Sequence, residues 1–151
     1  MKRIRKLKPH VASYIAGLVD GEGTVTLARA HRNEHRQLSV AISNTDINIL
    51  NWVLKMVGLG KIVPHKVYNK NHRQGFTYRV VSREAMMLLK QITPYLLTYK
   101  KKRAKMVIKS LERLTLRNGK YTPKMLKEKR KFVEKFMGLN PTNQKKALSF
   151  I

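Results

Sequence analysis

The sequence predicts an α+β fold in which helices back one face of a four-stranded antiparallel sheet. Three patterns predict it: an apolar helical repeat near the start of the chain, two pairs of alternating stretches joined by polar loops, and helical periodicity after each pair. The expected element order is αββαββαα, followed by one more helix. Antiparallel sheets of this kind commonly leave one face open, so the second sheet face is expected to be available for a ligand.

The first helix is predicted from Pro9, a residue suited to the first helical turn, to about Asp20. Apolar residues recur along it at helical spacing. Small residues recur at every fourth position, at Ser13, Gly17 and Gly21. Because small side chains let another backbone approach closely, this face is expected to pack against a second helix.

The two predicted hairpins join residues 24–30 to 37–43 and residues 61–68 to 76–81. In each stretch apolar residues alternate with polar, small or cationic ones, which is the pattern of a strand with one buried face. A register shift of one residue would turn every side chain to the other face. The choice of outward-facing residues therefore depends on this alternation.

Apolar periodicity also predicts the remaining helices. They cover approximately residues 47–57, 82–93, 95–116 and 123–137. Gly58 ends the first of these, and Pro94 breaks the second. Three regions result: a basic N-terminal arm at 1–8, a core at 9–116, and a helical basic C-terminal extension at 117–151.

The composition favours nucleic acid as the partner. The 151 residues include 33 Lys and Arg but only eight acids, giving a formal charge of +25, and such an excess favours binding to a polyanion. An apolar content of 42% indicates a folded domain. The absence of cysteine excludes disulfides, cysteine-ligated zinc and thiol catalysis. With no apolar run of about 18 residues and no signal peptide, we expect an intracellular protein, in a prokaryote or an organelle, with no membrane partner.

Two of the eight acids, Asp20 and Glu22, lie at the end of the first predicted helix, with Gly21 and Gly23 beside them. Glycine relaxes the steric limits on the backbone, so a carboxylate can stand beside exposed main-chain carbonyls there. Both are hard oxygen ligands that suit Mg²⁺. In a strongly basic chain, this pattern indicates a divalent metal ion held against a polyanion.

The segment IAGLVDGEG at residues 15–23 resembles the LAGLIDADG motif of the homing endonucleases. Ala16, Gly17, Leu18, Asp20 and Gly23 match the motif outright, and the strand pattern that follows agrees with the family over roughly residues 9–116. No second copy of the motif appears. The resemblance implies a homodimer that hydrolyses both strands of double-stranded DNA at a long pseudo-palindromic site, using Mg²⁺ or Mn²⁺.

The resemblance also implies roles for individual residues. Glu22, in the position of the second motif Asp, would be the direct metal ligand, helped by the carbonyl of Gly21. The helix interface would include Ser13, Ala16, Gly17 and Asp20. A surface ion pair is the alternative for Glu22. For Asp20 the resemblance implies a role at the helix end and interface rather than as a metal ligand.

Asp46 and Lys100 match positions that approach the active site in related dimeric enzymes, where Asp46 would contact an active-site water and Lys100 the scissile phosphate. Asp46 is equally suited to cap the helix that follows it. Lys100 lies in a run of four cations. Lys102 is the second candidate for the lysine that approaches the scissile phosphate, and ordinary binding of the nucleic-acid backbone is the alternative for the whole run.

In the family the open sheet face lies in the DNA major groove, and a strand of about 8 residues covers about 8 base pairs, or one half-site. The candidate DNA-binding residues are Thr26, Ala28, Arg32, Gln37, Ser39, Ser43, Lys61, His65, Lys70, Arg73, Thr77, Arg79 and Lys102. For any one of them, an ordinary polar strand face is an equally good explanation.

Two other functions remain open. One is a non-catalytic nucleic-acid binder, such as a maturase whose partner is intron RNA; the other is a basic RNA-binding protein of the ribosomal type. The carboxylate of Glu22 favours the nuclease, because a binder needs no carboxylate pointed at phosphate. A basic RNA-binding protein of the ribosomal type would not need the IAGLVDGEG segment at all.

Overall fold

A computed structural model describes residues 2–141 of the chain. Its elements, in order, are α1 (Pro9–Glu22), β1 (Gly23–Ala28), β2 (Gln37–Asn44), α2 (Ile47–Val57), β3 (Lys61–Pro64), β4 (Phe76–Val81), α3 (Ser82–Ile92), the 3-10 helix η1 (Thr93–Tyr95), α4 (Tyr99–Ser110) and α5 (Pro123–Gly138). The predicted α+β class and element order are confirmed. Residues 142–151 of the predicted C-terminal extension lie outside the described residues.

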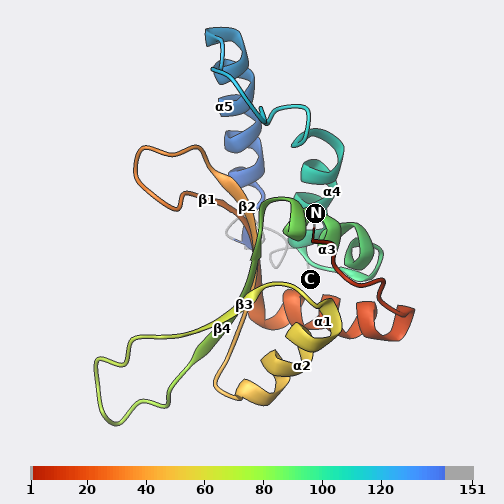
Figure 1. The fold of residues 1–151 in the computed structure, drawn as a ribbon, viewed down its shortest axis with the longest axis vertical. Helices are drawn as coiled ribbons and strands as arrows, with labels where there is room; N and C mark the ends of the chain where they lie inside the picture. Colours follow the sequence, from red (N-terminus) through yellow and green to blue (C-terminus); the bar gives the residue numbers. More distant parts are fainter. Residues whose placement is uncertain (1, 142–151) are drawn as a thin grey trace, which may run out of the picture.

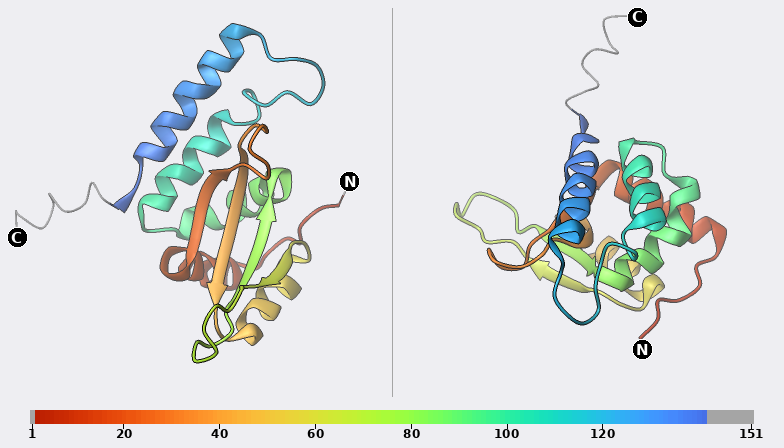
Figure 2. Two further views of the ribbon diagram at one scale, coloured as in Figure 1. Left: turned by 90° about the vertical axis from the view of Figure 1, so that its left-hand side faces the viewer. Right: turned by 90° about the horizontal axis from the view of Figure 1, so that it is seen from above.

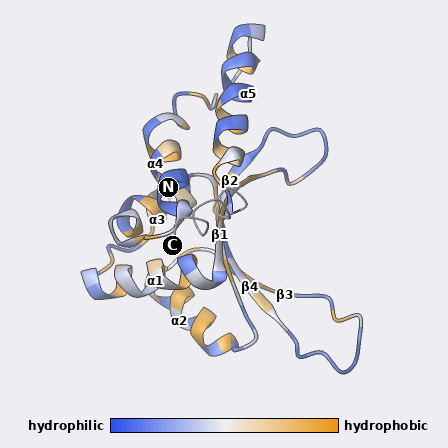
Figure 3. Ribbon diagram, turned by 180° about the vertical axis from the view of Figure 1, so that it is seen from behind, coloured by the Kyte–Doolittle hydropathy of each residue, from blue (hydrophilic) through white to orange (hydrophobic). Residues whose placement is uncertain are grey.

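The four strands form one antiparallel sheet in the order β1-β2-β4-β3. Helices α1 to α4 lie on one side of this sheet, and no helix of residues 2–141 covers the other side (Figure 1). Figure 2 shows the uncovered face directly, with α5 rising beside the end of the sheet. The loops of both hairpins extend beyond the sheet, and their tips are hydrophilic (Figure 3).

The covered face of the sheet supplies much of the core. Its side chains are at most 1% exposed and comprise Val25, Leu27, Leu38, Val40, Ile42, Tyr78 and Val80. They are the alternate residues that the sequence predicts to face inward, so the predicted strand register is confirmed. None of the helices within residues 2–141 is both long and apolar enough to cross a membrane.

Two elements are shorter than predicted. Strand β3 ends at Pro64 rather than near residue 68, and one more backbone hydrogen bond, from the His65 N–H to the Gly75 carbonyl at 2.8 Å, joins the two sides of the hairpin beyond it. Helix α4 begins at Tyr99 rather than near residue 95, because Thr98 is extended and its side chain caps the backbone N–H of Lys100. The extended segment before α4 contacts the end of α1, which defines the site described next.

Candidate catalytic and nucleic-acid site

Helix α1 ends directly against the sheet, with Glu22 as its last residue and Gly23 as the first residue of β1. Gly23 has extended backbone angles that any residue adopts. A glycine is required at this position for another reason, because a Cβ there would lie 2.7 Å from Val19 Cα and 2.8 Å from the Ala41 carbonyl oxygen. The close contact between helix and strands therefore fixes where Glu22 stands.

Asp20 holds the end of α1 to the segment before α4. Its carboxylate accepts hydrogen bonds from the backbone N–H of Leu97 at 2.8 Å, and from the N–H and hydroxyl of Thr98 at 3.1 and 2.5 Å. Partial burial alone would raise the pKa of Asp20, but these hydrogen bonds and the charge of Lys100 lower it below its ordinary value. Asp20 therefore has the role at the helix end that was expected from the sequence.

Replacing Asp20 by Asn is expected to lower the free energy of unfolding by about 1–3 kcal/mol, because an amide supplies one acceptor too few for the donors that face it. The depressed pKa of Asp20 makes its contribution present above pH 4 and progressively lost as the pH falls through the folded pKa. Urea unfolding between about pH 3 and 7 measures both effects. Asp46→Asn is the matched control, since Asn also caps helices; equal losses in the two variants would contradict the assignment.

Lys100 lies at the same helix end, although it is 80 residues away in the sequence. Its Nζ donates to the carbonyl oxygens of Val19 and Asp20, both at 2.8 Å, and its side chain is buried. Burial lowers the pKa of Lys100, and Arg103 adds to this against the opposing charge of Asp20. A cation at the carboxyl end of a helix also stabilises the helix dipole.

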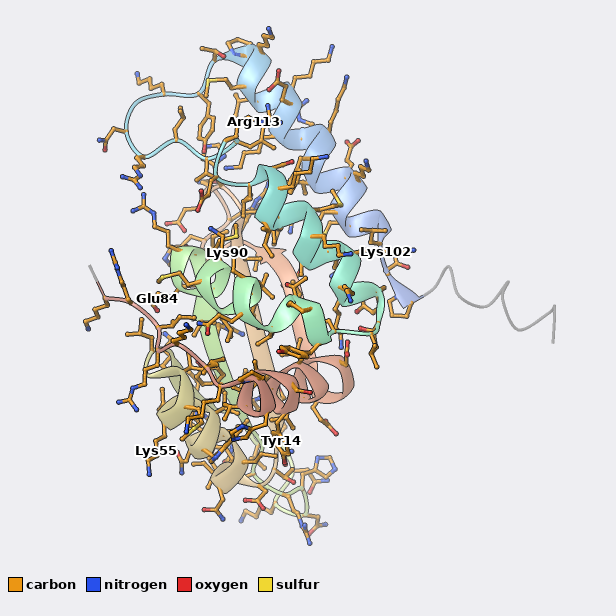
Figure 4. All side chains as sticks on the ribbon, turned by 90° about the vertical axis from the view of Figure 1, so that its right-hand side faces the viewer. Tyr14, Lys55, Glu84, Lys90, Lys102 and Arg113 are labelled. Carbon is orange, nitrogen blue, oxygen red and sulfur yellow. The ribbon has the colours of Figure 1, made fainter. Side chains whose placement is uncertain are left out.

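Of the cationic run in α4, only Lys100 is brought to the end of α1. Lys102 is exposed on the helical side of the molecule, away from the open sheet face (Figure 4). The structure thus distinguishes between the two lysines that the sequence could not separate.

Glu22 is exposed and makes no hydrogen bond or ion pair within the described part of the chain. The surface ion pair considered from the sequence is therefore not formed among residues 2–141. Its carboxylate and the adjacent Gly21 carbonyl are hard oxygen donors of the type that Mg²⁺ binds. No cluster of three or more acidic, histidine or cysteine side chains able to hold a metal occurs in residues 2–141.

Asp46 caps α2, since its side chain accepts a hydrogen bond from the N–H of Asn48 at 2.9 Å. The capping role considered from the sequence is therefore present. Asp46 also follows β2, in which Ile42 pairs with Gly23. It consequently lies beyond the same end of the sheet as Glu22.

The small-residue stripe of α1 is uncovered. Ser13, Gly17 and Gly21 are exposed, and a Cβ added at either glycine would meet no atom of residues 2–141 within 4 Å. Ala16, which was expected at a helix interface, is instead fully buried in the core of its own chain. It lies about 100° around the helix from Gly17, so the face available to a partner is narrower than the sequence suggested.

Eight of the candidate DNA-binding residues share the open face of the sheet. They pair across the strands as Thr26 with Ser39, Ala28 with Gln37, Ser43 with Thr77, and Lys61 with Arg79. Ser39 and Thr77 are only 6% and 9% exposed, because their short side chains lie on the central strands between larger neighbours. They offer less surface to a ligand than expected.

The other candidates lie outside the strands. Arg32, Lys70 and Arg73 are exposed in the two hairpin loops. His65, just after β3, hydrogen-bonds through Nε2 to the Thr77 hydroxyl, which also bonds to the Ser43 hydroxyl at 2.8 Å. This chain of three polar side chains crosses β4 and fixes their positions on the open face.

The sequence reasoning missed Thr98 and Arg103. Arg103 is buried and donates to the Val25 carbonyl at 2.8 Å and the Leu139 carbonyl at 2.6 Å, so it ties α4 to β1 and to the end of α5. Its spacing of three from Lys100 on one helix was a signal that both cations share the inner face. No comparable signal linked Thr98 to Asp20.

No protein-family model and no curated protein matches the sequence. Solved structures do. The homing endonuclease I-CvuI, in complex with its target in the presence of Ca, has a TM-score of 0.70 at 23% identity, over 88% of this chain and 83% of that one. The homing endonuclease I-TnaI has a TM-score of 0.57 at 22% identity, over 96% and 98%.

A third similar structure is the LAGLIDADG homing endonuclease I-GzeII in complex with its DNA target, with a TM-score of 0.60 at 17% identity. The match covers 85% of this chain but 44% of that one. At identities this low the structural matches establish the fold alone. The motif at the end of α1 agrees with this fold. The chain has the fold of the LAGLIDADG homing endonucleases.

Proposed function

We propose that the protein is a site-specific endonuclease that cuts both strands of a long pseudo-palindromic DNA target with a divalent metal ion. One observation carries the proposal: at the end of α1, Asp20 and Lys100 are engaged in holding the backbone, while the carboxylate of Glu22 is left unengaged. A repulsive carboxylate facing phosphate serves a nuclease and hinders a simple binder. The likeness to endonucleases solved with DNA supports the same function.

Glu22 and the Gly21 carbonyl would hold Mg²⁺ or Mn²⁺. Such an ion, when bound, supplies charge that activates a water and stabilises the attacked phosphate. Mg²⁺ sites typically use one or two carboxylates together with substrate phosphates, which agrees with a single carboxylate at this position and with the absence of a larger acidic cluster in residues 2–141. Asp20 and Lys100 keep the helix end in place, and the ammonium of Lys100 adds positive charge beside it.

The open sheet face would read one half-site in the major groove. Arg79 and Gln37 have side chains suited to bidentate contacts with guanine and adenine. Lys70 and Arg73 in the hairpin loop would contact phosphates, which fix the position of the protein on the duplex. A pseudo-palindromic target then requires two copies of the chain related by a two-fold axis.

The α1 stripe is the surface through which the two copies would pack. A Gly17→Leu variant is expected to elute as a monomer in gel filtration and to lose cleavage, because leucine occupies the space a partner helix needs. Among residues 2–141 no atom lies within 4 Å of the added Cβ, and helix propensity favours leucine by about 1 kcal/mol. Lys105→Leu on exposed α4 is the control; a Gly17→Leu dimer as stable as the wild type would rule out this interface.

The function is tested by incubating the protein with a randomised duplex library and Mg²⁺, against an EDTA control, and sequencing the cut ends. One long pseudo-palindromic site, cut on both strands only with metal, is the expected result. Binding without metal-dependent cutting would favour the non-catalytic binder, with intron RNA as the next ligand to try.

A further inference from the structure

A pocket of about 470 Å³ opens on the molecule between the start of β2, helix α3 and the segment that follows α4. Its volume lies within the range of about 300–1,000 Å³ that is typical of small-ligand sites. Lys90 of α3 belongs to its lining and marks this side of the molecule in Figure 4. The proposed endonuclease activity uses the end of α1 and the open sheet face, and Gln37 is the lining residue that it shares with this pocket.

The lining combines apolar and cationic side chains. Leu38, Met86 and Leu111, which are buried, and the half-buried Met87 supply apolar surface. The cations are Arg36, Arg83, Lys90 and Arg117, against one acid, Glu112, which already lies 3.8 Å from Lys90. A small inorganic anion would leave the apolar surface unfilled, and an apolar ligand would leave the cations uncompensated, so the lining fits a ligand with an apolar body and negative charge.

Polar groups in the lining add a hydrogen-bonding edge. Gln37 accepts a hydrogen bond from the Ser82 hydroxyl through its side-chain oxygen at 2.7 Å. This fixes the amide orientation and leaves its NH₂ group without a partner among the described residues. An NH₂ donor beside an apolar surface is suited to the acceptor atoms on the edge of a nucleobase.

We propose that this pocket binds one unpaired nucleotide of a single-stranded nucleic acid. The base would lie on the thioether and aliphatic surface, where every base can contribute its π face. Its phosphates would lie near Arg83 and Arg117, which make no hydrogen bond or ion pair within residues 2–141. A base inside a duplex is stacked on both sides, so the pocket selects single strands over duplex.

The test measures fluorescence anisotropy of short labelled single-stranded DNA and RNA of one sequence, with the corresponding duplex for comparison, on the full chain without divalent metal. Arg83→Gln/Arg117→Gln is expected to weaken single-strand binding at least about fivefold, and Lys105→Gln/Lys109→Gln, with the same charge change on exposed α4, less than about twofold. Met87→Trp, which fills the pocket, should weaken it similarly, with circular dichroism confirming that each variant is folded.

Equal losses in the two double variants would overturn the proposal, because they would show general attraction by charge. Full binding by a folded Met87→Trp, or duplex binding that depends on Arg83 and Arg117 as strongly, would also overturn it. Tighter binding of RNA than DNA would support the site and identify RNA as the source of the nucleotide. Neither metal nor Glu22 takes part, so failure here leaves the endonuclease proposal untouched.

Discussion

A Glu22→Gln variant is expected to bind its DNA target with nearly normal affinity but to cut it at least about a hundredfold more slowly, the upper end of what losing even an indirect metal contact costs. Glutamine keeps the length and shape of the side chain but removes the charge that attracts a divalent cation. Because Glu22 is exposed and makes no hydrogen bond or ion pair within residues 2–141, the variant should remain folded and keep the oligomeric state of the wild type.

Single-turnover cleavage of the target recovered from the duplex library measures the rate, and a gel-shift assay in Ca²⁺ measures binding. Glu128→Gln on exposed α5 makes the same chemical change outside the proposed site and should leave both unaffected. Cleavage by Glu22→Gln at the wild-type rate would remove Glu22 as a metal ligand. Loss of binding in proportion to cleavage would instead place it in the DNA contact surface.

The fold could be predicted from the sequence because its signals are local. Alternation in 24–30 and 37–43 places Val25 and Val40 on one face, and the observed register pairs these two residues. Strand length was less predictable, as β3 shows: residues 65–68 continue the pattern of an extended stretch, but the strand ends at Pro64.

The site likewise has a part that could be predicted from local sequence and a part that could not. Glu22 and Gly21 could be identified because the motif is contiguous in the sequence. The contacts that hold them in place join Asp20 to Thr98 and Lys100 to Val19, residues about eighty positions apart. Periodicity carries no information on such pairs. Ala16 shows that a local signal can also mislead. Its small size suggested a helix interface, but its side chain is buried in the core of its own chain.

Alanine substitutions at two glycines of the motif, Gly23 and Gly21, are expected to change the free energy of unfolding in opposite directions. Gly23→Ala is expected to lower the free energy of unfolding by at least about 1–3 kcal/mol, the usual cost of an overpacked site, and to abolish cleavage. The new Cβ would lie 2.7 Å from Val19 Cα and 2.8 Å from the Ala41 oxygen. Both are backbone atoms, so the helix must move off the strands and take Glu22 with it.

Gly21→Ala is the matched control two positions earlier in the chain. It lies inside α1, and no atom of residues 2–141 lies within 4 Å of an added Cβ. The higher helix propensity of alanine should therefore raise the stability of the isolated chain by up to about 1 kcal/mol. Urea unfolding at protein concentrations low enough to keep the chain monomeric compares the two. If Gly23→Ala unfolded at the wild-type urea concentration, the close contact of α1 with β1 and β2 would not be what positions Glu22, whereas destabilisation by Gly21→Ala would mean that its open face is covered within the chain.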